Sequence, residues 1–155
     1  METIKFKKLR STAHIPSRGT ACAAGFDLYA DITEPDATSN GGATASIIKP
    51  HMTKMIGTGI ALEIPDGYFG AVFARSGIAA KRGLRPANCV GVVDSDYRGE
   101  IIVALHNDTD YDRIIDNSER IAQIAFIPYA DVQFEEAQEL SNTDRDGGGF
   151  GSTGA

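Results

Sequence analysis

The sequence has little cysteine, no tryptophan and no long apolar run. Its two cysteines, Cys22 and Cys89, are 67 positions apart among 155 residues, which fits a pair of small buried side chains in a reduced protein better than a disulfide scaffold. No run approaches the roughly 18 apolar residues of a membrane-spanning helix. Met1 to Arg10 has basic residues but lacks the apolar stretch of a signal peptide. We therefore expect a cytoplasmic protein that binds no membrane.

Positive charge is also scarce. Fifteen Lys and Arg stand against 21 Asp and Glu, for a net charge of −6. A negative protein repels phosphate polymers, so we expect no direct nucleic-acid binding, and any anionic ligand must be held by a local group of donors. The length and the 42% hydrophobic content suffice for one domain with a full core, and they exclude a disordered chain, a coiled coil or a collagen.

Common catalytic and metal motifs are absent from the sequence. The histidines, His14, His51 and His106, are isolated and form no zinc-ligand spacing. Gly149 to Gly154 has the glycine spacing of a P-loop, but Ala155 stands where that motif needs lysine. No Gly-x-Ser-x-Gly elbow occurs, so an α/β-hydrolase nucleophile is not indicated.

Short apolar segments separated by turn residues predict an all-β fold. Ile60 to Ile64, a turn, and Tyr68 to Ala74 read as one hairpin, and Cys89 to Val93 with Ile101 to Leu105 as a second. Their spacing is typical of a β-sandwich. Further predicted strands are Ile4 to Leu9, Phe26 to Tyr29, Met55 to Ile56, Ile114 to Ile115, Ile121 to Ile127 and Val132 to Phe134.

One short helix is predicted between Ser76, as the N-cap residue, and Gly83, as a left-handed residue at its C-terminal end. Two segments look irregular. Glu34 to Ala45 reads as a polar surface insertion, and Asn142 to Ala155 as a glycine-rich flexible tail. We predict a β core over residues 1–141 and a flexible lid over 142–155.

Three groups of residues remain that could carry chemistry. Arg75, Ser76 and Gly77 suit a phosphate site, although helix capping explains them about as well. Asp94 follows an apolar strand, so its carboxylate could orient and deprotonate a water, or it could form an Asx turn. Arg145 and Phe150 lie in the tail, which reads as disorder or as a lid that closes over a nucleotide.

At these positions the chain resembles the trimeric deoxyuridine triphosphate nucleotidohydrolases (dUTPases). All five motifs of that family occur in order and span nearly the whole chain. They are Ala23 to Leu28 (AAGFDL), Ala74 to Leu84 (ARSGIAAKRGL), Asn88 to Gly99 (NCVGVVDSDYRG), Glu119 to Ile124 (ERIAQI) and Arg145 to Gly154 (RDGGGFGSTG). Five motifs in the right order argue against a chance resemblance.

The resemblance implies a trimer of jelly-roll-like subunits, each a distorted β-barrel or sandwich, with active sites between the chains. It also implies hydrolysis of dUTP to dUMP and pyrophosphate, with Asp94 activating a water for attack on the α-phosphorus. Asn88 would pair with uracil in a hairpin pocket too close for a 5-methyl group. Tyr97 would lie under the deoxyribose and exclude a 2′-hydroxyl.

The resemblance further implies contacts to the phosphates and the metal. Mg²⁺ would be bound mainly by triphosphate oxygens, with Asp27 near its water shell. The residues expected to contact substrate phosphates are Arg75, Ser76, Gly77, Gln123, Arg145, Ser152 and Thr153, and Phe150 is expected to stack on the base.

Two positions depart from the family pattern. Ala74 replaces the usual proline before Arg75, and Asp146 adds a negative charge beside Arg145. Two other functions stay open. A related deoxycytidine triphosphate deaminase would share the fold and part of the phosphate machinery, and a catalytically silent dUTP-binding regulator would keep the binding residues and could use the 34–45 insertion as a contact.

Overall fold

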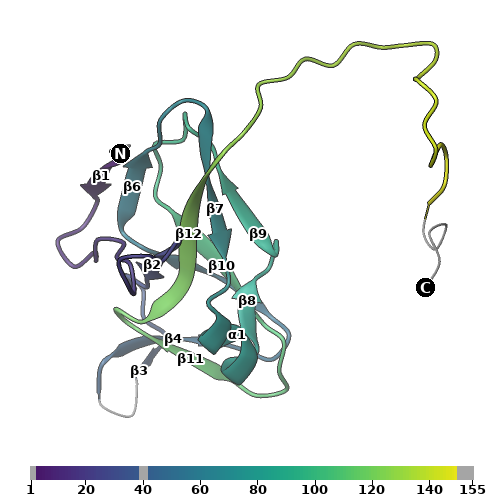
Figure 1. Cartoon of the computed structure of the whole chain (residues 1–155). Coiled ribbons are helices and arrows are strands. Elements are labelled where there is room, and N and C mark those ends of the chain that lie inside the picture. Colours follow the sequence, from purple (N-terminus) through teal and green to yellow (C-terminus); the bar gives the residue numbers. More distant parts are fainter. Residues whose placement is uncertain (1–2, 39–41, 150–155) are drawn as a thin grey trace.

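The computed structural model describes residues 3–38 and 42–149 (Figure 1). The described residues form many short strands and one short helix, which confirms the predicted all-β class. The elements are β1 (Lys5–Lys8), β2 (Phe26–Tyr29), β3 (Ala37–Thr38), β4 (Thr44–Ile48), β5 (Thr53–Gly57), β6 (Ile60–Glu63), β7 (Tyr68–Phe73), α1 (Ser76–Arg82), β8 (Leu84–Pro86), β9 (Val90–Val93), β10 (Ile102–Asn107), β11 (Arg113–Asp116) and β12 (Arg120–Pro128).

The strands pair in four antiparallel sheets, and no closed barrel forms among the described residues. The sheet orders are β1-β6, β5-β10-β8, β11-β4-β3 and β2-β12-β7-β9. In the four-stranded sheet, β12 lies between β2 and β7. Gln123 of β12 is therefore opposite both Asp27 and Phe73. This register brings three motifs that are far apart in sequence to one place.

A single apolar core lies between these sheets. Its fully buried side chains come from most of the strands, and full burial of one Leu or Ile contributes about 1.5–3 kcal/mol. They include Leu28, Ile48, Ile60, Leu84, Leu105, Ile115, Ile121 and Ile124. Over the described residues, no helix is long and apolar enough to cross a membrane.

Both predicted hairpins are wrong in the single chain. β6 pairs with β1 instead of β7, and β7 pairs with β12 and β9. β9 ends the four-stranded sheet, whereas β10 lies between β5 and β8 in another sheet. The turn residues correctly marked where the chain reverses. They could not define the partners, because strands at the corners of a sandwich pass from one sheet to the other.

The helix matches the prediction at one end only. Gly83 has the predicted left-handed conformation, with φ of 62°, and its N–H bonds to the last turn. The residue at the N-cap position is Arg75, not Ser76, and none of the described side chains caps the helix. The Ser76 hydroxyl is exposed instead.

Two other expectations are also corrected. Cys22 and Cys89 are both exposed in the chain, not buried. The 34–45 segment is not wholly irregular, because β3 pairs with the start of β4 at Ala37 opposite Ala45. Both errors arose because small and polar residues carry no periodic signal of burial or pairing.

The chain leaves the sheets at Pro128, and residues 128–147 are exposed. Figure 1 shows this segment running away from the sheets beyond β12. The strand predicted at Val132 to Phe134 is not formed, and the Phe134 side chain has no cover. The domain boundary at residue 141 stays a prediction.

Candidate active site

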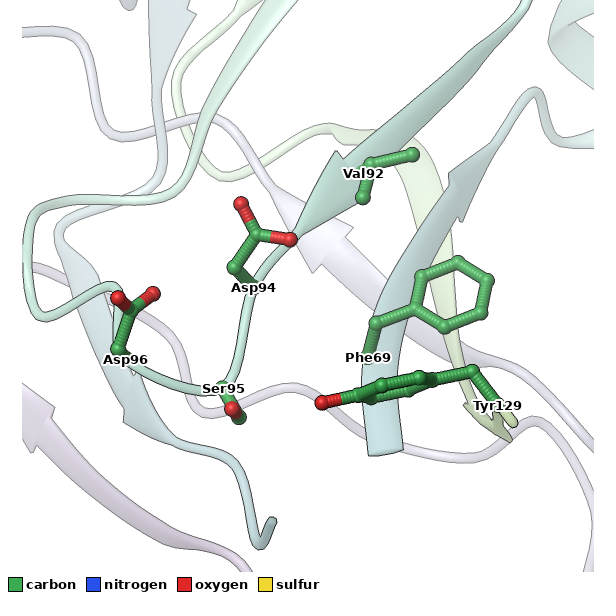
Figure 2. Close-up of a pocket in the computed structure, with 6 residues that line it drawn as sticks. All are labelled: Phe69, Val92, Asp94, Ser95, Asp96 and Tyr129. Atoms are coloured by element: carbon green, nitrogen blue, oxygen red, sulfur yellow. The ribbon is translucent and has the colours of Figure 1, made fainter. Parts of the chain in front are cut away.

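Asp94 directly follows β9, whose last residue, Val93, is opposite Gly70 of β7. The preceding strand therefore holds the aspartate at the edge of the sheet. Its carboxylate is exposed and accepts no hydrogen bond from another described residue. It lines an open pocket of about 570 Å³ with Phe69, Val92, Ser95, Asp96 and Tyr129 (Figure 2). A carboxylate of this kind has its oxygens available to a water.

Residues 94–100, here called the Asp94 loop, are held by contacts that do not use the Asp94 carboxylate. The Tyr97 N–H donates to the Asp94 carbonyl at 3.2 Å, and the Tyr97 hydroxyl donates to the Glu100 carbonyl at 3.0 Å. The Tyr97 ring covers Gly99, where a Cβ would clash with it. The backbone makes the turn, which disfavours the alternative of an Asx turn at Asp94.

Asn88 lies in the turn between β8 and β9. The turn is closed by the Cys89 N–H, which donates to the Pro86 carbonyl at 3.0 Å, and Cys89 has a positive φ of 62°. The exposed Asn88 amide reaches back along β9, since a Cβ built on Gly91 would lie 3.4 Å from Nδ2. Gly91 precedes Asp94 by three residues, or about 10 Å of strand. That separation is of the size of a nucleoside.

Arg75, Asp27 and Arg120 form an ion cluster beside β12. Arg75 Nε donates to Asp27 Oδ1 at 2.6 Å, and Arg120 Nη1 to Oδ2 at 3.3 Å. The Asp27 side chain is only 11% exposed, whereas Arg120 is 51% exposed. Ser76 and Gly77 follow Arg75 on the surface. The cluster combines two guanidinium groups with free polar surface, which suits an anionic ligand.

Gln123 joins this cluster from β12. Its Nε2 donates to the Ala74 carbonyl at 3.0 Å, and so fixes the backbone immediately before Arg75. The space around it is limited, because a Cβ on Gly25 would lie 2.8 Å from Gln123 Oε1. The first, second and fourth motifs therefore meet in one place.

The structure does not bring Asp94 to this cluster within one chain. Arg75 reaches across β12 toward β2, whereas Asp94 follows β9 at the other edge of the sheet. Three strand spacings separate β2 from β9, or about 14 Å. The two groups are also at opposite ends of β7, since Val93 is opposite Gly70 and Val90 opposite Phe73.

The described part of the tail contacts only itself. Arg145 Nε donates to the Gly148 carbonyl at 3.0 Å, and the Asp146 N–H donates to Thr143 Oγ1 at 3.0 Å. Arg145 is exposed. Phe150, Ser152 and Thr153 lie outside the described residues.

A comparison with protein families shows which family the chain belongs to. The dUTPase family model matches residues 11–154 and thus includes all five motifs. The chain belongs to the dUTPase family. Two deoxyuridine 5′-triphosphate nucleotidohydrolases are similar over nearly their full lengths. That of Hydrogenobaculum sp. is 43% identical, with 96% of this chain and 95% of the relative covered. That of Nautilia profundicola is 44% identical, with 97% and 98% covered.

Solved dUTPase structures have the same fold. The dUTPase of Staphylococcus bacteriophage 80alpha with dUpNHpp superimposes with a TM-score of 0.85 and 26% identity, and each chain is covered completely. The similarity confirms the jelly-roll-like fold of the dUTPase family for this chain, with its strands in separate sheets instead of a closed barrel.

Sequence reasoning missed two residues of this candidate site. Arg120 lies inside the fourth motif, and its ion pair with Asp27 could have been suspected from the basic side chain alone. Tyr129 had no such signal. Its position beside Asp94 depends on the register of β12 with β7, in which Pro128 is opposite Tyr68.

Proposed function

We propose that the chain hydrolyses dUTP to dUMP and pyrophosphate, with Asp94 as the general base. The observation that carries this proposal is the exposed Asp94 carboxylate, which has no hydrogen-bond partner among residues 3–38 and 42–149 and is held at the end of β9 beside an open pocket. A base of this kind can accept a proton from a water as that water attacks the α-phosphorus. The bond from the α-phosphorus to the bridging oxygen then breaks, and pyrophosphate leaves.

The uracil and the sugar are assigned to the turn before β9 and to the Asp94 loop. Asn88 would pair with the base, since its amide lies beside Gly91, and the pocket would be too close for a 5-methyl group. Tyr97 would lie under the deoxyribose. Its ring is held over Gly99 and by its hydroxyl bond to Glu100, so it would exclude a 2′-hydroxyl.

The phosphates are assigned to the ion cluster. Arg75 and Gln123 would contact them from the β12 side, with Ser76 and Gly77 from the start of α1. In this assignment Arg120 shares Asp27 with Arg75, so that Asp27 orients both guanidinium groups. Charge-assisted bonds from such groups would offset the repulsion between an acidic protein and a triphosphate.

Dependence on a divalent metal is a property of the family, and we propose Mg²⁺ here. No described cluster of three or more His, Cys, Asp or Glu could hold a metal. Both Asp27 oxygens already accept hydrogen bonds from arginines. These residues fit an ion that is bound mainly by triphosphate oxygens and touches Asp27 through water. When bound, it would neutralise charge on the phosphates.

The active unit is proposed to be a homotrimer with sites between chains. The separation of Asp94 from Arg75 supports this, because a complete site then needs Asp94 from one chain and Arg75 from another. The tail of a chain would close over the site, with Arg145, Ser152 and Thr153 at the phosphates and Phe150 on the base. A cytoplasmic location and the absence of direct nucleic-acid binding stay predictions.

The test is pyrophosphate release from dUTP, dCTP, dTTP and UTP by wild type, Asp94→Asn and Asp96→Asn. We expect turnover with dUTP alone and a loss of about 10²- to 10⁴-fold in Asp94→Asn, with dUpNHpp binding retained. Asp96 lines the same pocket and is the matched control, with nearly full activity expected.

Three results would contradict the proposal. Full turnover by Asp94→Asn would remove the assigned base. Ammonia released from dCTP would identify a deaminase. Binding of dUTP by wild type without any turnover would identify a silent regulator.

A further inference from the structure

Arg10 connects the segment after β1 to the end of the Asp94 loop. Its Nε donates to Asp31 Oδ2 at 2.6 Å, its Nη1 to Glu100 Oε2 at 3.1 Å, and its Nη2 to the other Glu100 oxygen. The side chains of Asp31 and Glu100 are 3% and 20% exposed. A planar guanidinium bonded on two sides to carboxylates is held in one orientation.

The far side of this network is bonded to the backbone at the junction of β5 and β6. The Leu9 N–H, just before Arg10, donates to the Gly59 carbonyl at 2.7 Å. The Asp31 N–H donates to the Gly57 carbonyl at 2.8 Å. Arg10 is thus anchored to the segment between β5 and β6, independently of the Asp94 loop.

The near side of the network continues into the loop. Glu100 Oε1 also accepts the Gly59 N–H at 2.7 Å, so three donors surround this carboxylate and hold its pKa below its usual value, with the Arg10 bond as the main cause. The Glu100 carbonyl accepts the Tyr97 hydroxyl at 3.0 Å. A continuous set of contacts therefore leads from Arg10 through Glu100 to the Tyr97 ring.

The network lies tightly against the backbone of Gly57 and Gly59, and Arg10, Asp31 and Glu100 also line a cavity of about 260 Å³. A Cβ on Gly57 would clash with Glu100 Oε1, and a Cβ on Gly59, which has a φ of +67°, would clash with Asp31 Oδ2. Side chains at either position would push the carboxylates away from Arg10. Stability alone does not account for the network, because a buried ion pair seldom contributes more net stabilisation than apolar side chains packed in its place.

We propose that Arg10 is a positioning residue that, through Glu100, sets the place of the Tyr97 ring and so the preference for deoxyribose over ribose. The proposal rests on the proposed function, in which Tyr97 lies under the sugar. Without Arg10, the Glu100 carboxylate keeps only the bond from the Gly59 N–H among the described contacts, and the end of the loop can shift. A small shift of the ring makes room for a 2′-hydroxyl.

The test compares kcat/KM for dUTP and for UTP in wild type, Arg10→Ala, Glu100→Gln and the double variant. We expect each single change to lower the dUTP-to-UTP ratio about tenfold. Because both residues act through the same contact, the double variant should lose no more than the larger single loss. The control is Lys5→Ala, which removes the exposed Lys5–Glu63 pair on the same β1–β6 sheet and should leave the ratio unchanged.

The ratio separates positioning from stability, since a merely destabilised protein loses activity on both substrates equally. If Arg10→Ala does not fold, Glu100→Gln decides the question, because its amide preserves the shape of the carboxylate. An unchanged ratio in the folded variants, or losses that multiply in the double variant, would overturn the proposal. A wild type that does not hydrolyse dUTP would overturn the proposed function instead, so the two failures are distinct.

Discussion

Arg75 and Asp94 lie toward opposite edges of the four-stranded sheet and at opposite ends of β7. Arg75 is turned toward Asp27 on β2, and Asp94 continues from β9. In the proposed trimer, a nucleotide held by both groups would lie between two chains. This relationship makes the assembly testable through function as well as through size.

Mixing two inactive variants should restore activity. Asp94→Asn and Arg75→Ala each remove one half of every site, but random trimers from equal amounts restore an intact pair in about one quarter of the sites. We expect about one quarter of wild-type pyrophosphate release after subunit exchange, and none from either variant alone. Light scattering should give a trimer for both. No recovery from mixed, trimeric variants would show that the two residues do not share a site between chains.

Gly91→Ala should weaken nucleotide binding. The new Cβ would lie 3.2 Å from the buried Val72 Cβ, so β9 must shift away from β7, and with the Cβ also 3.4 Å from Asn88 Nδ2 this shift would displace the Asn88 amide. We expect KM for dUTP to rise roughly fivefold to tenfold, the equivalent of one hydrogen bond, and the free energy of unfolding to fall by about 1–3 kcal/mol. Gly19→Ala is the control, since nothing lies within 4 Å of its added Cβ. Equal KM values for both variants would remove Asn88 from the base pocket.

The stability conferred by Glu100 should disappear in acid. Its pKa in the folded protein is lowered from 4.5, mainly by its hydrogen bonds from Arg10. A lowered pKa stabilises the fold above the unfolded value, and this contribution is lost as the pH falls through the folded value. In urea unfolding, the free energy of unfolding of the wild type should exceed that of Glu100→Gln at pH 7. This difference in free energy should shrink steadily below pH 4.5. A difference that stays constant with pH would show that the charge of Glu100 is not involved.

Deleting residues 143–155 should reduce catalysis without unfolding the domain. The described residues of this segment bond only to one another, so we expect the melting temperature to change by less than about 2 °C. Loss of a lid that excludes water should lower kcat about 10²-fold. Arg145→Ala in the full-length chain should give part of this loss. A truncated chain with full kcat would show that the tail has no part in the reaction.

Much of the fold could be predicted because its signals are local. The strand at Phe26 to Tyr29 was predicted with the bounds that β2 has, and Gly83 ends α1 as expected. The partners of the strands could not be predicted, since pairing depends on apolar surfaces far apart in the chain. For the same reason the strand predicted at Val132 to Phe134 was wrong: alternation without a partner sheet leaves those side chains exposed.

The candidate site, too, could be predicted only in part from the sequence. The order of the motifs and the chemical types at Asp94, Asn88 and Arg75 are written in the sequence, and they were enough to indicate the family. The sequence contains no sign that Arg10 meets Glu100, 90 positions away, or that Asp27 is shared by two arginines.

The amino-acid order alone determined the strand segments, the helix end and the set of reactive groups, because these depend on neighbours along the chain. Only the tertiary structure decided that Asp94 and Arg75 face different edges of one sheet and that Tyr129 lies beside Asp94. Register and sheet order set those positions, and both follow from burying one core that all the strands share.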